Sequence, residues 1–257
     1  MNNNKTKSLL TISSIVIFSC VIIFIVQLFQ VLYFQRDYFM KNYNTDYWKD
    51  RYEHSQYQLP LSKRIIGDDG LYAYAGYRLI KGDNPFSINV DKPPFGKYLI
   101  GLSILLFKNP YYYSLIFGIG TLAVFFFLSK IILKTTQKAF IATTLLSLDT
   151  LFISQFWTST LDISQLFFML LSIFTVLFWF SKGRSSFILF ISGLSLGLFA
   201  EIKPPIILPL ILVAQLFFIL IKQKSLLLNM GLFIFGIIIG VLLPYIRYLQ
   251  LGYSFID

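Results

Sequence analysis

Long apolar runs, separated by short polar turns, dominate the chain. Seven of these runs approach the roughly 20 residues that a helix needs to cross the hydrocarbon core of a bilayer. The pattern therefore predicts an all-α polytopic membrane protein with about seven transmembrane helices. The expected spans are residues 8–34, 111–129, 140–157, 163–181, 186–200, 206–221 and 226–245, of which 186–200 and 206–221 are the shortest.

The chain opens on residues 1–7, which carry two lysines and precede the first apolar run. A secretory signal peptide has a shorter apolar core and ends in a small-residue cleavage site, and neither feature is found before Gln35. We therefore expect residues 1–34 to form an uncleaved first transmembrane helix.

The positive charges predict the orientation of the spans, because cytoplasmic loops carry an excess of Lys and Arg. With the N-terminus inside, residues 35–110 form a large outer loop and residues 111–257 form six further transmembrane helices. This order predicts an integral protein of the plasma (inner) membrane with a cytoplasmic N-terminus. The basic residues of the inner turns are Lys130, Lys134, Lys138, Lys182, Arg184, Lys222 and Lys224.

A further apolar run, residues 96–107, competes with this topology. It is twelve residues long, which is short for a crossing. Counting it as a span would turn the lysine-bearing turns to the outside. We therefore expect a short helix that lies at, or dips into, the membrane surface within the outer loop.

The composition agrees with a membrane protein and argues against a water-soluble one. Hydrophobic residues make up 56% of the chain, charged residues only 13%, and the mean hydropathy is +0.69. The net charge of +10 comes from basic residues scattered between apolar runs, so no nucleic-acid partner is expected. The single cysteine, Cys20, excludes an intramolecular disulfide.

An acidic pair, Asp68 and Asp69, opens a segment of the outer loop in which Leu71, Ala75 and Leu79 recur at helical spacing. This spacing predicts an amphipathic helix on the membrane surface. Asp is favoured at a helix N-cap and in the first turn, but capping needs only one carboxylate. The spacing leaves a functional role and a capping role equally open. His54, earlier in the loop, is interpreted as a surface residue.

Two lysines, Lys92 and Lys97, flank the paired prolines of the outer loop. The prolines predict an extended entry into the short helix. Lysines at a membrane boundary commonly snorkel to the interface, where a lipid phosphate also lies. Both interpretations apply to each of these lysines.

Three further acidic residues lie at or inside the apolar runs. Asp162 stands where the chain re-enters the membrane, either as a helix cap or as a functional group. Asp149 lies inside an apolar run, and its role stays open between a packed polar contact and access to a cavity. Glu201 and Lys203 either neutralise each other or leave Lys203 as a second cation for a phosphate.

Taken together, these elements resemble the GT-C membrane glycosyltransferases, in particular the group of protein O-mannosyltransferases and bacterial aminoarabinose transferases. Asp69 and Lys92 stand where the mannosyltransferases usually have Glu and His, so the bacterial branch is the better fit. Members of the group are also usually longer. The elements, in order, are Asp68-Asp69, Asp91-Lys92-Pro93-Pro94-Phe95-Gly96-Lys97, Leu161-Asp162 before Phe167-Phe168, and Gly197-Leu198 through Lys203-Pro204.

The resemblance implies a metal-independent, inverting transfer of a sugar from a polyprenyl-phosphate donor to a protein or lipid acceptor at the outer membrane face. Asp68 would accept the proton of the acceptor hydroxyl, with Asp69 and Asp162 orienting the acceptor. Lys92, Lys203 and Lys97 would bind the donor phosphate. No cofactor is implied, and a divalent metal is not indicated.

Two other functions stay open. One is a transporter or lipid flippase, although its polar residues should line interruptions in the middle of the membrane, whereas here the charges gather at one face. The other is a noncatalytic membrane subunit that acts with a partner subunit. The expected partners in every case include membrane lipids.

Overall fold

The computed structural model describes residues 3–183, 185–222 and 225–254, and in these ranges the protein is built from helices, with no strand. This confirms the predicted all-α class. In the described residues, Ser55 and Arg64 form an isolated parallel β-bridge outside any strand. The helices are α1 (Asn3–Phe34), α2 (Arg36–Met40), α3 (Thr45–Glu53), α4 (Asp68–Ile80), α5 (Pro94–Phe107), α6 (Tyr111–Leu133), α7 (Thr136–Leu148), α8 (Thr150–Ser154), α9 (Asp162–Lys182), α10 (Phe187–Ala200), α11 (Leu208–Ile221), α12 (Leu226–Leu242) and α13 (Ile246–Gln250).

The predicted count of seven spans is not confirmed. By length and composition, four helices of the described chain could cross a membrane, and α7 with α8 gives a fifth if their 64° bend belongs to one broken span. At 1.5 Å per residue the 14-residue helices α10 and α11 are about 21 Å long, short of the roughly 30 Å hydrocarbon core. The four long helices are Ser13–Phe34, Tyr111–Leu133, Asp162–Lys182 and Leu226–Gln250.

The bend between α7 and α8 answers the open question about Asp149. Its carboxylate accepts a hydrogen bond of 2.7 Å from the backbone N–H of Phe152 and so caps α8. A side-chain oxygen at this place satisfies one of the free N–H groups at a helix start. Asp149 is therefore the N-cap of a new helix after the bend.

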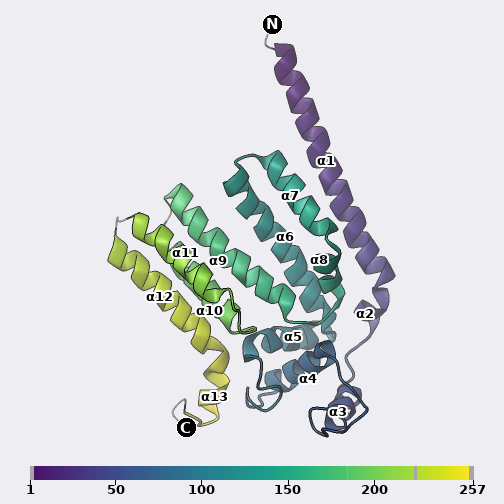
Figure 1. Ribbon diagram of the computed structural model, residues 1–257. Coiled ribbons are helices and arrows are strands. Elements are labelled where there is room, and N and C mark those ends of the chain that lie inside the picture. The colour runs from purple at the N-terminus through teal and green to yellow at the C-terminus, as the bar shows by residue number, and fades with distance from the viewer. Residues whose placement is uncertain (1–2, 184, 223–224, 255–257) are drawn as a thin grey trace.

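The long helices run up and down in alternation, so that two sets of connections lie at opposite ends of the molecule (Figure 1). The N-terminal end of α1 shares the upper end with the C-terminal ends of α6, α9 and α11. The segment from α2 to α5, the start of α9, the link from α10 to α11 and α13 lie at the lower end. This arrangement has the alternation that the basic turns predicted.

Helices α4 and α5 lie across the lower ends of the long helices, in contact with each other (Figure 1). Their backbones touch at Gly76 and Gly101, because a Cβ atom on Gly101 would lie 2.2 Å from the carbonyl oxygen of Gly76. Such close packing fixes the direction of α4 and with it the place of the acidic pair at its start.

Helices α10 and α12 pack just as closely within the bundle. A Cβ atom on Gly193 would lie 1.9 Å from the carbonyl oxygen of Phe233, and one on Gly240 would lie 2.5 Å from that of Leu194. Small residues at helix contacts are typical of membrane bundles, where close backbone approach replaces the hydrophobic effect. The same packing holds the link after α10 in place.

Candidate active site

The loop between α3 and α4 is folded back by polar contacts that fix the approach to the acidic pair. The side chain of Gln56 donates to the carbonyl of Ile66 at 2.9 Å and accepts from its N–H at 3.0 Å. Ile66 is buried and lies two residues before Asp68. Gln56 therefore holds the backbone that leads into α4.

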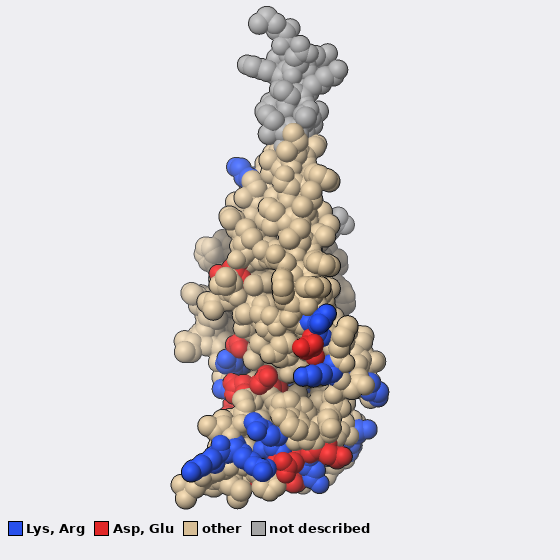
Figure 2. All heavy atoms as spheres, turned by 90° about the vertical axis from the view of Figure 1, so that its right-hand side faces the viewer, with Lys and Arg blue, Asp and Glu red and all other residues tan. Residues whose placement is uncertain are grey.

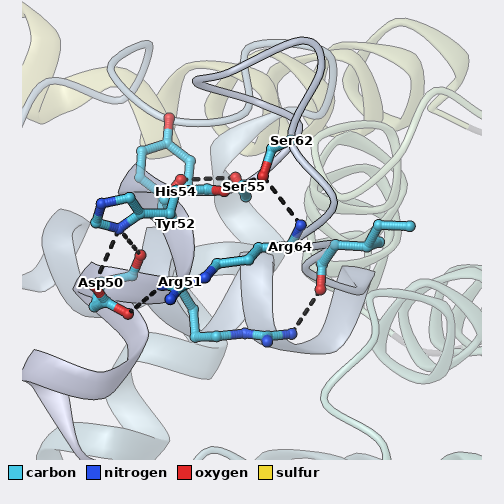
Figure 3. Close-up of polar contacts among 8 residues, drawn as sticks. Asp50, Arg51, Tyr52, His54, Ser55, Ser62 and Arg64 are labelled. Carbon is cyan, nitrogen blue, oxygen red and sulfur yellow. Dashed lines mark hydrogen bonds and ion pairs between the residues drawn. The ribbon is translucent and has the colours of Figure 1, made fainter.

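A second set of contacts closes the outer side of the same loop (Figure 3). The guanidinium of Arg64 donates to Asp50 at 3.2 Å, and Arg51 donates to the carbonyl of Ile65 at 2.6 Å. His54 lies in this group beside Asp50 and is half exposed, with its ring Nδ1 at 3.0 Å from the Asp50 carboxylate. The histidine lies at the surface, as interpreted from the sequence, and it contacts Asp50 within this loop.

Asp68 and Asp69 lie in the first turn of α4, and Gly67 is the N-cap residue. No side chain caps the helix by a hydrogen bond, but both aspartates lie in the first turn, where the helix dipole favours negative charge. A structural role and a functional role of the pair therefore both stay open. Asp68 is exposed, and its carboxylate accepts a hydrogen bond of 3.4 Å from the hydroxyl of Tyr72, one turn along α4. The pair thus lies at the N-terminal end of α4, which no side chain caps.

The Lys-Pro-Pro element packs against two distant parts of the chain. The backbone N–H of Phe95 donates to the carbonyl of Glu201 at 3.1 Å. Gly96 lies against Leu161 and Ile202, since a Cβ atom there would be 2.7 Å from Leu161 Cδ2 and 3.0 Å from Ile202 Cγ2. Three elements that the sequence keeps far apart are therefore in contact.

Asp162 and Lys203 form an ion pair of 2.9 Å at this junction. The amide of Gln165 donates to the carbonyl of Lys203 at 2.6 Å and holds the same link. Glu201 does not neutralise Lys203, because its carboxylate accepts from the hydroxyl of Tyr245 at 2.8 Å. Burial raises the pKa of Glu201, and the Tyr245 hydrogen bond partly offsets this rise.

The three lysines expected to bind phosphate have different surroundings. Lys203 is paired with Asp162. Lys97 is fully buried, and its ammonium donates to the carbonyls of Ile88 at 3.2 Å and Asn89 at 2.8 Å. Within the described ranges, the Lys92 ammonium makes no hydrogen bond or ion pair and is partly exposed.

Burial of Lys97 has an electrostatic consequence. Desolvation of the ammonium lowers the pKa of Lys97 to about 8, against the opposing effect of Asp91. The expectation that Lys97 lies open at the membrane boundary is therefore wrong for this conformation. Its place beneath residues 88–89 makes it a residue that positions the loop before the Lys-Pro-Pro element.

Burial and nearby carboxylates raise the pKa of two tyrosines, Tyr72 and Tyr57. Burial raises the pKa of Tyr72, and the charges of Asp68 and Asp162 raise it further. Burial likewise raises the pKa of Tyr57, followed by the charges of Asp68 and Asp91. Asp68 therefore shares its surroundings with carboxylates from two other elements. Asp91 belongs to the Lys-Pro-Pro element, and the sequence predicts no role for it.

A cavity of about 600 Å³ lies next to the first turns of α4, although neither Asp68 nor Asp69 lines it. Its wall residue Trp48 packs on Gly70, since a Cβ atom on Gly70 would lie 2.2 Å from the Trp48 ring. The backbone carbonyl of Asp69 is held by the hydroxyl of Ser159 at 3.0 Å. The cavity is lined mainly by aromatic and polar residues of α2, α3, the link between them and the start of α6, among them Tyr38, Asn42, Asn44, Tyr47, Trp48 and Tyr111.

Sequence reasoning missed this cavity, because residues 36–62 show no sustained periodicity. A partial signal was present in the density of Tyr, Trp and Asn in that segment. Seen from the side of α1, charged side chains gather over the lower part of the molecule, around this region (Figure 2). Among the residues the structure describes, no three His, Cys, Asp or Glu side chains come together as a metal-binding group.

The fold and the site together define a class of protein. A polytopic helical membrane protein that gathers carboxylates and lysines at one end of its bundle has the arrangement of a GT-C type membrane glycosyltransferase. The family model described as dolichyl-phosphate-mannose-protein mannosyltransferase matches residues 91–247, and the chain belongs to this family. No curated protein and no solved structure matches the chain.

The family match bears on the predicted site residue by residue. It includes Lys92, Lys97, Asp162 and Lys203, and it begins after the acidic pair of α4. Membership confirms the predicted class and a lipid-linked sugar donor of the polyprenyl-phosphate type. The roles of the individual residues stay predictions.

Proposed function

We propose that the protein transfers a sugar from a polyprenyl-phosphate donor to an acceptor hydroxyl at the outer face of the plasma membrane, with inversion at the anomeric carbon. The observation that carries this proposal is the contact of Gly96 with Leu161 and Ile202. It brings the Lys-Pro-Pro element to the Asp162–Lys203 ion pair, at the end of the molecule where α4 begins. Donor and acceptor groups can then meet in one place.

In the proposed reaction the acceptor oxygen attacks the anomeric carbon while the bond from that carbon to the phosphate oxygen breaks. The acceptor proton passes to the carboxylate of Asp68, and the leaving group departs as a polyprenyl phosphate. A positioned carboxylate within hydrogen-bond reach is suited to this proton transfer. The exposed carboxylate of Asp68, bonded to the Tyr72 hydroxyl, supports this role.

Negative charge develops on the leaving phosphate, and cations nearby stabilise it. Lys92 is the favoured group for binding the phosphate, because its ammonium has no hydrogen-bond or ion-pair partner in the described chain. It comes directly after Asp91 in the sequence. Lys203 would contribute while it orients Asp162 through their ion pair. Lys97 would act indirectly, by holding residues 88 and 89, which precede the element, through hydrogen bonds to their carbonyls.

The cavity next to the first turns of α4 is the proposed acceptor site. Its polar and aromatic walls suit a hydroxyl-bearing acceptor, which is a protein or a lipid-linked molecule. Trp48 joins the cavity to the acidic pair through its contact with Gly70. The acceptor hydroxyl would therefore reach Asp68 and Asp69 from this side.

The proposal is tested by sugar transfer in proteoliposomes that contain the purified chain and a radiolabelled polyprenyl-phosphate sugar. D68N should abolish transfer while membrane insertion is unchanged. D46N, which changes an exposed carboxylate of α3, serves as the matched control. Undiminished turnover of D68N would remove the assignment.

The same preparation separates the two other functions. A flippase would move the labelled donor across the bilayer without transferring its sugar. A noncatalytic subunit would show no transfer until a partner is added, and D68N would then leave the activity of the complex unchanged.

A further inference from the structure

Another cavity, lined by lysines and apolar side chains, lies at the opposite end of the bundle from the candidate active site. It has a volume of about 580 Å³ and lies between the C-terminal ends of α6 and α9. In Figure 1 these helix ends are at the top, whereas α4 and α5 are at the bottom. Its lining includes Lys130, Lys134, Lys182, Phe127, Phe174 and Phe178.

Three ammonium groups converge on this cavity. Lys130 and Lys134 are one helical turn apart at the end of α6, and Lys182 is in the last turn of α9. All three residues are exposed, and within the described parts of the chain none of them forms a hydrogen bond through its side chain or an ion pair. Three like charges around one hollow repel each other unless an anion lies between them.

The floor of the cavity is aromatic. The rings of Phe127 and Phe174 are 6.2 Å apart, and those of Phe174 and Phe178 are stacked at 5.6 Å. Phe127 is 51% exposed on a helix long and apolar enough to cross the membrane, so this floor faces acyl chains. The site is thus cationic at the rim and apolar below it, in the same order as a lipid from headgroup to chain.

We propose that this cavity binds the phosphate headgroup of an anionic membrane lipid, with the first carbons of its acyl chains on the Phe127–Phe174 floor. Basic pockets between transmembrane helices at the cytoplasmic side recognise such headgroups. Lysine binds phosphate as a point charge, and three lysines provide this without fixed geometry. The site is separate from the sugar-transfer site and does not depend on the proposed function.

A purely topological role of the lysines makes a different prediction. Positive charge in this turn helps to set the orientation of the chain, whichever lysine carries it. Lys138 lies in the same turn, is exposed, and does not line the cavity. K134Q and K138Q remove the same charge from the same turn and form a matched pair.

The experiment measures lipid retention by native mass spectrometry on the full chain, with phosphatidylglycerol and phosphatidylcholine as the probes. The unmodified chain should bind phosphatidylglycerol more tightly than phosphatidylcholine. Since each lysine near a membrane surface contributes about a fivefold gain in affinity for anionic lipid, K134Q should lose about fivefold and K130Q/K134Q/K182Q about 100-fold. K138Q should bind as the unmodified chain does.

Further variants keep the proposal open to refutation. K130R/K134R/K182R retains the charges and should bind phosphatidylglycerol normally, which separates loss of charge from loss of folding. Equal losses in K134Q and K138Q, or normal binding by the triple Gln variant, would overturn the site. Displacement of the lipid by millimolar inorganic phosphate would assign the cavity to a soluble anion and overturn the lipid proposal.

Discussion

Two helices of the protein begin with an aspartate at the same end of the molecule, and their surroundings differ. At the start of α9, Asp162 is held by the ammonium of Lys203 at 2.9 Å. At the start of α4, Asp68 accepts a hydrogen bond of 3.4 Å from the hydroxyl of Tyr72, and in the described parts of the chain it forms no ion pair. A carboxylate already bound to an ammonium is suited to orienting a substrate, whereas one bound to a neutral hydroxyl remains available to take a proton.

The largest expected loss of sugar transfer comes from removing the carboxylate of Asp68. D68N should lower the turnover number for sugar transfer about 1000-fold, within the range that a lost general base produces. D162N should lower it less, by about 30-fold, because an orienting group contributes less than the proton acceptor. Steady-state transfer rates of both variants give the ratio. A larger loss in D162N than in D68N would reverse the assigned roles.

The next effect concerns the two cations. K92M should reduce the turnover number about 100-fold, in the range found when one group that stabilises developing charge is removed. K203M should cost less, because the charge of Lys203 is already shared with Asp162. A D162N/K203M double-mutant cycle should show non-additive losses, since the two side chains are in contact. Additive losses would show that Asp162 and Lys203 act independently in sugar transfer.

A smaller effect tests how the α4 aspartates are positioned. Q56A removes both hydrogen bonds to Ile66 and should lower transfer about tenfold, since a misplacement of about 1 Å can cost more than this. Q58A is the matched control, because Gln58 bonds to the Tyr52 hydroxyl in the same loop. Equal losses in both variants would point to general loosening of the loop.

The smallest effect is on stability and concerns Lys97. Its folded pKa of about 8 lies below the ordinary value of 10.5, so the unfolded chain binds more protons between these values. Stability should therefore rise as the pH increases from about 8 to about 10.5. The melting temperature in detergent should follow this rise in the unmodified chain and not in K97M. Parallel pH profiles of the two proteins would contradict the buried ammonium.

Much of the fold follows from local pattern. The apolar runs predicted helices at 111–129 and 163–181, and α6 and α9 occupy Tyr111–Leu133 and Asp162–Lys182. The run at 140–157 is not one straight helix, because it contains a 64° bend at Asp149 that hydropathy does not reveal. Hydropathy counts apolar residues, whereas a single capping carboxylate decides where one helix stops and another begins.

The candidate site was predictable as a set of residues and not as a set of contacts. Its motifs could be read in order, but the Asp162–Lys203 pair joins residues 41 positions apart. Lys97 is buried where its ammonium meets the carbonyls of residues 88 and 89 and its backbone meets α4. Such pairings depend on how helices cross, as at Gly76 and Gly101. The cavity near Trp48 depends on a loop without periodicity, which left no pattern to interpret.

The central claim is that the start of α4 and the start of α9 lie on one side of the membrane, opposite the lysine turns. Single cysteines at Asp68, Asp162 and Lys134 in a C20S background, labelled in sealed right-side-out vesicles with a membrane-impermeant maleimide, test it most directly. The structure and the predicted orientation together require labelling at 68 and 162 and none at 134 until the vesicles are opened. Labelling of 68 and 162 from opposite sides would contradict the claim.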